Sequence, residues 1–120
     1  MKDKVVIVTG AARGLGQKYS CEFAKVGAKV VFADLNSCKD TEDEIKKISN
    51  DFLSLSLDVT DFSSCKNLAK KTREKFGRID VLVNNAALYG ALKSSRFEDI
   101  DSNQWDRAMN VNVKGVWNCC

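Results

Sequence analysis

The chain of 120 residues is long enough for one domain or part of one, and too short for two complete domains. Hydrophobic residues make up 44% and charged residues 29%, a balance that supports a buried core and excludes intrinsic disorder. The 19 basic and 16 acidic residues are interspersed and leave a net charge of +3, so nucleic acid is not an expected partner.

The histidine and cysteine content narrows the possible chemistry. The absence of histidine excludes Ser-His-Asp hydrolysis and histidine-ligated zinc, and we expect no metal site. Five cysteines without a C-x-x-C pair are interpreted as reduced thiols. The start MKDKVVIV lacks the apolar region of a signal peptide, and no stretch approaches the ~18 apolar residues of a membrane span. We therefore expect a cytoplasmic protein with no membrane partner.

The first half of the chain predicts a strand, helix, strand, helix unit. A β-branched run at residues 5–8 predicts a strand buried on both faces. A helix stopped by Gly27 follows, with apolar residues at helical spacing: Leu15, Tyr19, Phe23 and Val26. Residues 30–33 predict a second buried strand that closes at Asp34, and residues 41–48 a second helix with Ile45 and Ile48 on one face.

The second half continues the alternation. Leucines alternate with polar residues over 52–59, as expected for an edge strand covered on one face. Asp61 is the predicted N-cap of a helix that Gly77 ends, and residues 79–84 predict a fourth strand. Asp101 and Gln104 resemble a capping box for a last helix, whose apolar positions Trp105, Met109, Val113 and Val116 continue to the final residue.

Alternating strands and amphipathic helices predict an α/β fold, a Rossmann-like, doubly wound parallel sheet. The sequence provides four strands and about four helices, with an expected strand order of 3-2-1-4. The helical pattern is still running at Cys120, and a four-stranded sheet would leave an apolar edge and faces uncovered. Residues 1–120 are therefore interpreted as an incomplete domain, cut within the fourth helix.

A glycine-rich turn and an acidic residue indicate dinucleotide binding. The first strand runs into TGAARGLG, where Gly10, Gly14 and Gly16 would let a pyrophosphate approach the backbone at a helix N-terminus. This spacing is neither G-x-G-x-x-G nor Walker A, and by itself could mark only a tight turn. Asp34, 24 residues after Gly10 by subtraction, could accept hydrogen bonds from ribose hydroxyls and repel a 2′-phosphate, which favours NAD over NADP. Arg13 is either a surface residue or a contact for the pyrophosphate or a 2′-phosphate.

Four segments, in order, resemble the short-chain dehydrogenase/reductase family: the turn T-G-x-x-x-G-x-G, then LDVTD, NNAA and NVKG. The resemblance implies that pyrophosphate contacts come from Gly10, Gly14, Leu15 and Gly16, with Arg13 near the phosphates. It also implies that Asp58 and Val59 contact adenine, that Asn85 and Ala86 line the cofactor, and that Asn112 supports a proton relay. Ala87 stands where the family has glycine, which reduces backbone freedom.

The resemblance implies an NAD(H)-dependent oxidoreductase that transfers a hydride between a small alcohol or ketone and nicotinamide. The family's catalytic serine, tyrosine and lysine would lie after Cys120, so the 120-residue chain alone should be inactive. Tyr89 and Lys93 have Y-x-x-x-K spacing, but no helix signal would place them on one face, and we exclude them. Residues 1–120 would form the dinucleotide-binding part of a full-length homodimer or homotetramer.

Two alternatives belong to other functional classes. A truncated, non-catalytic product could bind a dinucleotide or a full-length partner. A receiver or P-loop protein would require clustered acids at the strand ends, or Lys-Ser or Lys-Thr after the last glycine. Neither feature is present, so only the first alternative remains.

Overall fold

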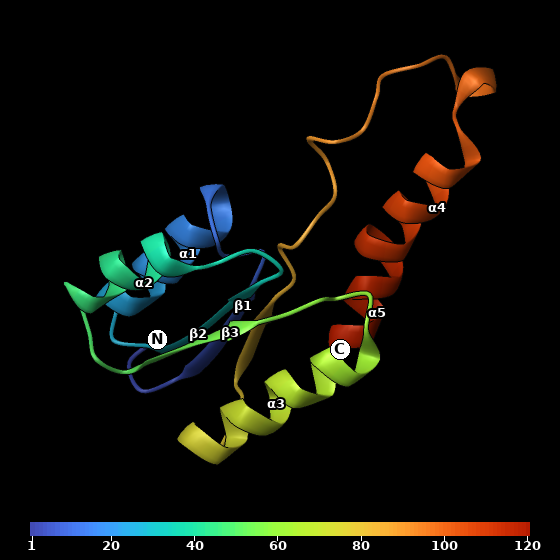
Figure 1. Ribbon diagram of the computed structural model, residues 1–120. Helices are drawn as coiled ribbons and strands as arrows, with labels where there is room; N and C mark the ends of the chain where they lie inside the picture. Colours follow the sequence, from blue (N-terminus) through green and yellow to red (C-terminus); the bar gives the residue numbers. More distant parts are fainter.

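The computed structural model describes residues 1–120 and contains one four-stranded parallel sheet (Figure 1). Its strands follow the order β3-β2-β1-β4, with Ile7 paired to Val31 on one side and to Leu82 on the other. The predicted fold class and strand order are confirmed. The strand bounds are β1, Val5–Thr9; β2, Lys29–Asp34; β3, Phe52–Ser56; and β4, Val81–Val83.

Both faces of the central strands are covered. Side chains of a strand point alternately to opposite faces, so Val6 and Phe32 enter one apolar cluster while Ile7 and Val31 enter another. Helices α1 (Gly14–Lys25) and α2 (Lys39–Lys46) cover the first face. Helices α3 (Phe62–Phe76) and α5 (Gly115–Cys119) lie on the other side (Figure 1). The continuous apolar runs of β1 and β2 follow from this double coverage.

Helix α1 packs with a different face from the predicted one. Leu15, Tyr19 and Val26 are exposed, and Leu15 keeps 64% of its surface. The buried residues are Gly16, Ser20 and Ala24, and the Ser20 hydroxyl donates to the carbonyl of Gly16 at 2.8 Å. Small side chains let the helix axis come close to β1, a proximity that the larger apolar residues would prevent. In α2, Ile45 is buried as predicted, but the helix ends at Lys46, before the predicted Ile48, which is exposed.

The predicted ends of α3 are confirmed. The Asp61 carboxylate accepts from the N–H of Ser63 at 2.9 Å, and Gly77 ends the helix in the left-handed region at φ 78°. Cys65, Leu68 and Thr72 form its buried face.

The outer strands are shorter than predicted. β3 ends at Ser56, although Leu57 and Val59 still enter the core beside Leu53 and Leu55, as their alternation predicted. β4 ends at Val83, and two residues later the backbone N–H of Asn85 donates to the Thr9 hydroxyl. The predicted edge position of β3 is confirmed.

Residues after β4 form an arm that extends away from the sheet (Figure 1). It holds a short 3-10 turn (Phe97–Asp99), α4 (Ser102–Met109) and a π-helical turn (Asn110–Lys114) that leads into α5. The arm makes the molecule 49 Å long but only 25 × 22 Å across. No helix combines the length and apolar character needed to cross a membrane.

The predicted last helix is present and continues through the π-helical turn, but its predicted apolar face is wrong. Trp105, Met109 and Val113 are exposed, whereas Gly115 and Asn118 are buried. A Cβ at position 115 would lie 2.7 Å from Cγ2 of Val59. The glycine therefore permits the close approach of α5 to Val59, and this contact determines which face of the helix is buried. The Asp101 carboxylate does cap α4 by accepting from the N–H of Gln104 at 2.9 Å.

Candidate functional site

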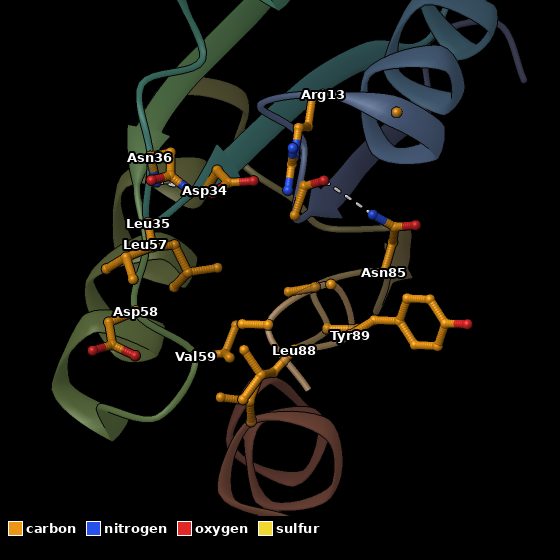
Figure 2. Close-up of a pocket in the computed structure, with 17 residues that line it drawn as sticks. Arg13, Asp34, Leu35, Asn36, Leu57, Asp58, Val59, Asn85, Leu88 and Tyr89 are labelled. Carbon is orange, nitrogen blue, oxygen red and sulfur yellow. Dashed lines mark hydrogen bonds between the residues drawn. The ribbon is translucent and has the colours of Figure 1, made fainter. Parts of the chain in front are cut away.

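A cavity of about 800 Å³ opens at the carboxyl ends of β1, β2 and β4, the edge where ligands bind in open parallel sheets. Eight of the eleven residues predicted for the site line it (Figure 2): Gly10, Arg13, Gly14, Asp34, Asp58, Val59, Asn85 and Ala86. These residues come from four separate loops, so the fold brings together side chains up to 76 positions apart in the sequence (86 minus 10).

The glycine turn presents backbone to this cavity. Gly10 and Gly14 have positive φ angles of 66° and 60°, a conformation that side chains disfavour. A Cβ at Gly14 would meet no atom within 4 Å, so the position borders open space. Arg13 is the N-cap residue of α1, but its side chain accepts no hydrogen bond from the first turn, and that turn holds no acidic residue. The backbone N–H groups of residues 14–16 donate to no protein group. This helix end can therefore hold an anionic group.

A hydrogen-bond network fixes the turn against the end of β4. Asn85 Nδ2 donates to the carbonyls of Thr9 and Gly10, both at 3.0 Å, and Figure 2 shows this amide directed at the turn. The Thr9 hydroxyl accepts from the N–H groups of Asn85 at 3.1 Å and Ala86 at 3.0 Å. Asn85 thus shapes the cavity wall by holding two loops together, which is a structural task beside its predicted one.

The Asp34 carboxylate is oriented by backbone groups at the end of β2. Oδ2 accepts from the N–H of Ala12 at 3.0 Å, and Oδ1 accepts from the N–H of Asn36 at 2.9 Å. A carboxylate has about four acceptor positions, so lone pairs remain for a ligand. The bond from Ala12 joins Asp34 to the segment that carries Arg13, and Figure 2 shows both side chains in the cavity lining. Burial and the nearby Asp34 charge raise the pKa of the Cys38 thiol to about 11.

Asp58 and Val59 form the wall that follows β3. Oδ1 of Asp58 accepts from the N–H of Thr60 at 2.8 Å and from its hydroxyl at 2.7 Å, a turn that holds the carboxylate in place. The backbone N–H of Asp58 donates to the hydroxyl of Ser64 at 3.1 Å. Val59 is buried, and its apolar side chain could contact a flat ring.

Three predicted residues do not line the cavity. Leu15 lies on the exposed side of α1. Gly16 is buried against the turn, where a Cβ would collide with the carbonyl of Gly10. The absence of a side chain at this position therefore lets α1 approach the turn. The side chain of Asn112 pairs with the backbone of Leu88, accepting from its N–H at 2.8 Å and donating to its carbonyl at 3.1 Å.

Sequence reasoning missed other contributors to the cavity. Leu88 and Val111 line it from the arm, and Asn36 lines it beside Asp34. Thr41, buried in α2, supports it by donating its hydroxyl to the carbonyl of Ala11 at 2.7 Å. No local pattern marks these residues, because their proximity to the turn depends on the tertiary fold. Tyr89 lies in a non-helical segment and is 85% exposed, so it cannot share a helix face with Lys93.

The fold and this cavity define an α/β domain with an uncapped helix N-terminus beside a carboxylate. A family model described as short chain dehydrogenase matches residues 4–120. The chain belongs to the short-chain dehydrogenase family, which confirms the resemblance found in its motifs.

Individual relatives agree with this assignment. The chain is similar to 2-dehydro-3-deoxy-D-gluconate 5-dehydrogenase of Dickeya dadantii, with 32% identity over 98% of this chain and 45% of the relative. It also resembles the crystal structure of 3-ketoacyl-(acyl-carrier-protein) reductase from Brucella melitensis complexed with NADH, with TM-score 0.86, 32% identity, and 98% and 48% of the two chains covered. Carveol dehydrogenase from Mycobacterium avium in complex with NAD gives TM-score 0.92, 26% identity, and 99% and 47% coverage. The chain spans about half the length of these three proteins.

Proposed function

We propose that residues 1–120 form the dinucleotide-binding part of an NAD(H)-dependent oxidoreductase that transfers a hydride between a small alcohol or ketone and nicotinamide. The observation that carries the proposal is the pairing, in one cavity, of the uncapped N-terminus of α1 with the oriented carboxylate of Asp34. Two neighbours in fold, from Brucella melitensis and Mycobacterium avium, are complexes with NADH and NAD, which supports the choice of ligand.

The residues present fit such a ligand. The free N–H groups at residues 14–16, with Arg13 beside them, would hold the pyrophosphate, since the helix end carries partial positive charge. Asp34 would accept from the ribose hydroxyls, and Asp58 with Val59 would contact adenine. Asn85 and Ala86, which line the same cavity as Leu88, would line the cofactor.

The bound cofactor would supply the hydride acceptor or donor, and this chain's residues would bind and orient it. The serine, tyrosine and lysine that act on the substrate in this family are proposed to lie outside residues 1–120. Asn112 is proposed to support their proton relay, and its paired hydrogen bonds to Leu88 already fix its amide. Hydride transfer would therefore require the longer protein.

We propose NAD as the preferred cofactor over NADP. A 2′-phosphate placed at the ribose would meet the Asp34 carboxylate, and like charges at close range repel. Arg13 points toward the same end of the cavity and would offset part of this repulsion. The preference therefore rests on Asp34, whose orientation is fixed by two backbone N–H groups.

Two glycines provide a matched test of nucleotide binding. Gly14 and Gly77 both have positive φ and open space where a Cβ would lie, but only Gly14 borders the cavity. Gly14→Ala and Gly77→Ala should each cost about 1 kcal/mol of stability from the strained backbone. Gly14→Ala should also weaken NADH binding by about tenfold or more, because its methyl group occupies phosphate space and displaces a charge-assisted hydrogen bond.

The measurement is a fluorescence titration of NADH into each variant, with thermal unfolding as the test of folding. Gly77→Ala should bind NADH within about twofold of the original chain, since its change lies outside the cavity. Equal weakening by both variants, or no NADH binding by a chain that unfolds cooperatively, would contradict the proposal.

An association function is favoured by a separate observation. Four large apolar side chains spaced four residues apart are exposed along the arm: Trp105, Met109, Val113 and Trp117. Such a stripe is typical of a surface that another protein covers. We propose that it is the contact of a homodimer or homotetramer, and it would serve equally in a non-catalytic dimer partner. The five free cysteines support a reducing location such as the cytoplasm.

A further inference from the structure

Two cysteines that are far apart in the sequence lie against each other in the fold. Sγ of Cys65, in α3, is 3.6 Å from Sγ of Cys119, in α5, across 54 positions of sequence. The two helices run beside each other under the same face of the sheet (Figure 1). Cys65 is buried and Cys119 is half-buried, and no other pair of thiols in the chain is in contact.

Rigid contacts on both sides keep this pair together. Asn118 Nδ2, next to Cys119, donates to the carbonyl of Val59 at 2.8 Å in a buried hydrogen bond. Gly115 lies so close to Val59 that no side chain would fit between them. Helix α5 therefore cannot slide along α3 without breaking packed contacts, and the two thiols have a high local concentration. A disulfide requires the two sulfur atoms to approach from 3.6 Å to about 2.05 Å.

We propose that Cys65 and Cys119 form a disulfide by exchange with a low-molecular-weight disulfide such as oxidised glutathione. The more accessible Cys119 thiolate attacks one glutathione sulfur, which forms a mixed disulfide and releases one glutathione thiolate. The Cys65 thiolate then attacks Sγ of Cys119 and releases the second. Two protein thiols are oxidised, one glutathione disulfide is reduced to two thiols, and the two protons lost by the cysteines are taken up by the glutathione thiolates.

The surroundings of the pair set the pH dependence of this reaction. Burial raises the pKa of Cys119 to about 12, with Cys65 and Cys120 adding to the shift. Burial also raises the pKa of Cys65, helped by the charges of Asp61 and Asp58. Because the thiolate is the reactive form, the exchange should be slow at pH 7 and its rate should rise about tenfold per pH unit up to pH 9.

Peptide mapping tests the proposal directly. Cleavage after Lys47, Lys66 and Lys114 separates Cys65, in peptide 48–66, from Cys119, in the peptide that starts at Gly115. The reduced protein carrying Cys120→Ser, which removes the neighbouring thiol, is incubated with oxidised glutathione at pH 8 and digested without reductant. We expect these two peptides to be joined in most molecules, and the joined species to disappear in Cys65→Ser but not in Cys21→Ser.

The same reaction in 8 M urea separates native proximity from chance pairing. There the cross-links should be spread over Cys21, Cys38, Cys65 and Cys119, because the unfolded chain has no fixed pairs. A folded protein that ends with glutathione on Cys119, or with cross-links distributed as they are in urea, would overturn the proposal. So would a rate of disulfide formation that does not change between pH 7 and pH 9.

Discussion

Asp34 combines a structural task with a proposed binding task at the end of β2. Its two carboxylate oxygens accept from the backbone of the glycine turn and from the backbone of its own loop. The carboxylate therefore connects the two segments that would surround the adenosine ribose. An asparagine keeps only one of these two acceptors, so Asp34→Asn removes the charge and also one backbone hydrogen bond, and thermal unfolding has to accompany its titration.

Asp34→Asn should weaken NADH binding by about fivefold, because hydrogen bonds to a charged acceptor are roughly 1 kcal/mol stronger than neutral ones. It should also reduce the preference for NADH over NADPH, since the repulsion of the 2′-phosphate is lost. Parallel fluorescence titrations with both nucleotides measure the ratio of the two dissociation constants. Asp40→Asn, which neutralises an exposed acid in α2, is the matched control. An unchanged ratio in Asp34→Asn would remove Asp34 as the source of specificity.

Within the arm, two side-chain amides attach the helical part to the loop that precedes it, and both do so in the same way. Asn112 pairs with both backbone groups of Leu88, and Gln104 pairs with both backbone groups of Lys93 at 2.7 and 3.0 Å. Each amide replaces the backbone partner that a loop lacks. The Gln104 side chain was expected to complete a capping box, but it bonds to Lys93 instead, so only the Asp101 half of that prediction is confirmed.

Asn112→Ala and Gln104→Ala should each lower the free energy of unfolding by about 1 to 2 kcal/mol, the value of the lost hydrogen bonds at an exposed site. Their effects on ligand binding should differ, because Leu88 lines the cavity and Lys93 does not. We expect only Asn112→Ala to weaken NADH binding and to accelerate amide exchange at Leu88. Thermal unfolding, NADH titration and hydrogen exchange provide the three measurements. Equal loss of NADH affinity in both variants would contradict this assignment.

For the whole molecule, the arm creates a surface that the sheet does not cover. The radius of gyration is 15.2 Å, compared with about 14 Å for a compact chain of this length. Trp117 keeps 71% of its surface and Val113, which was predicted to lie on the apolar face of the last helix, keeps 54%. The apolar stripe along α4 and α5 thus lies outside the core of residues 1–120.

Val113→Glu should abolish self-association, because a carboxylate would be buried without a partner in the contact and raise the dissociation constant by at least about tenfold. Val26→Glu is the matched control, since Val26 is 53% exposed at the end of α1, away from the stripe. Sedimentation velocity over a range of concentrations should show a dimer for the original chain and Val26→Glu, and a monomer for Val113→Glu. A monomeric original chain at ~100 μM would contradict the proposed contact.

The local signals in the sequence determined the fold class, the strand order expected for it, and eight of the 17 residues that line the cavity. Apolar runs, helix caps and the glycine turn act over a few residues, so they can be recognised without knowing the rest of the structure. The tertiary structure alone decided which side of α1 and of the last helix is buried, where β4 ends, and which cysteines meet. Helical spacing shows where apolar residues recur, but small residues such as Gly16 and Gly115 decide how closely a helix can approach its neighbours. Close approach of a helix to the sheet buries more surface and forms more van der Waals contacts. These gains exceed the cost of leaving larger apolar side chains exposed to solvent.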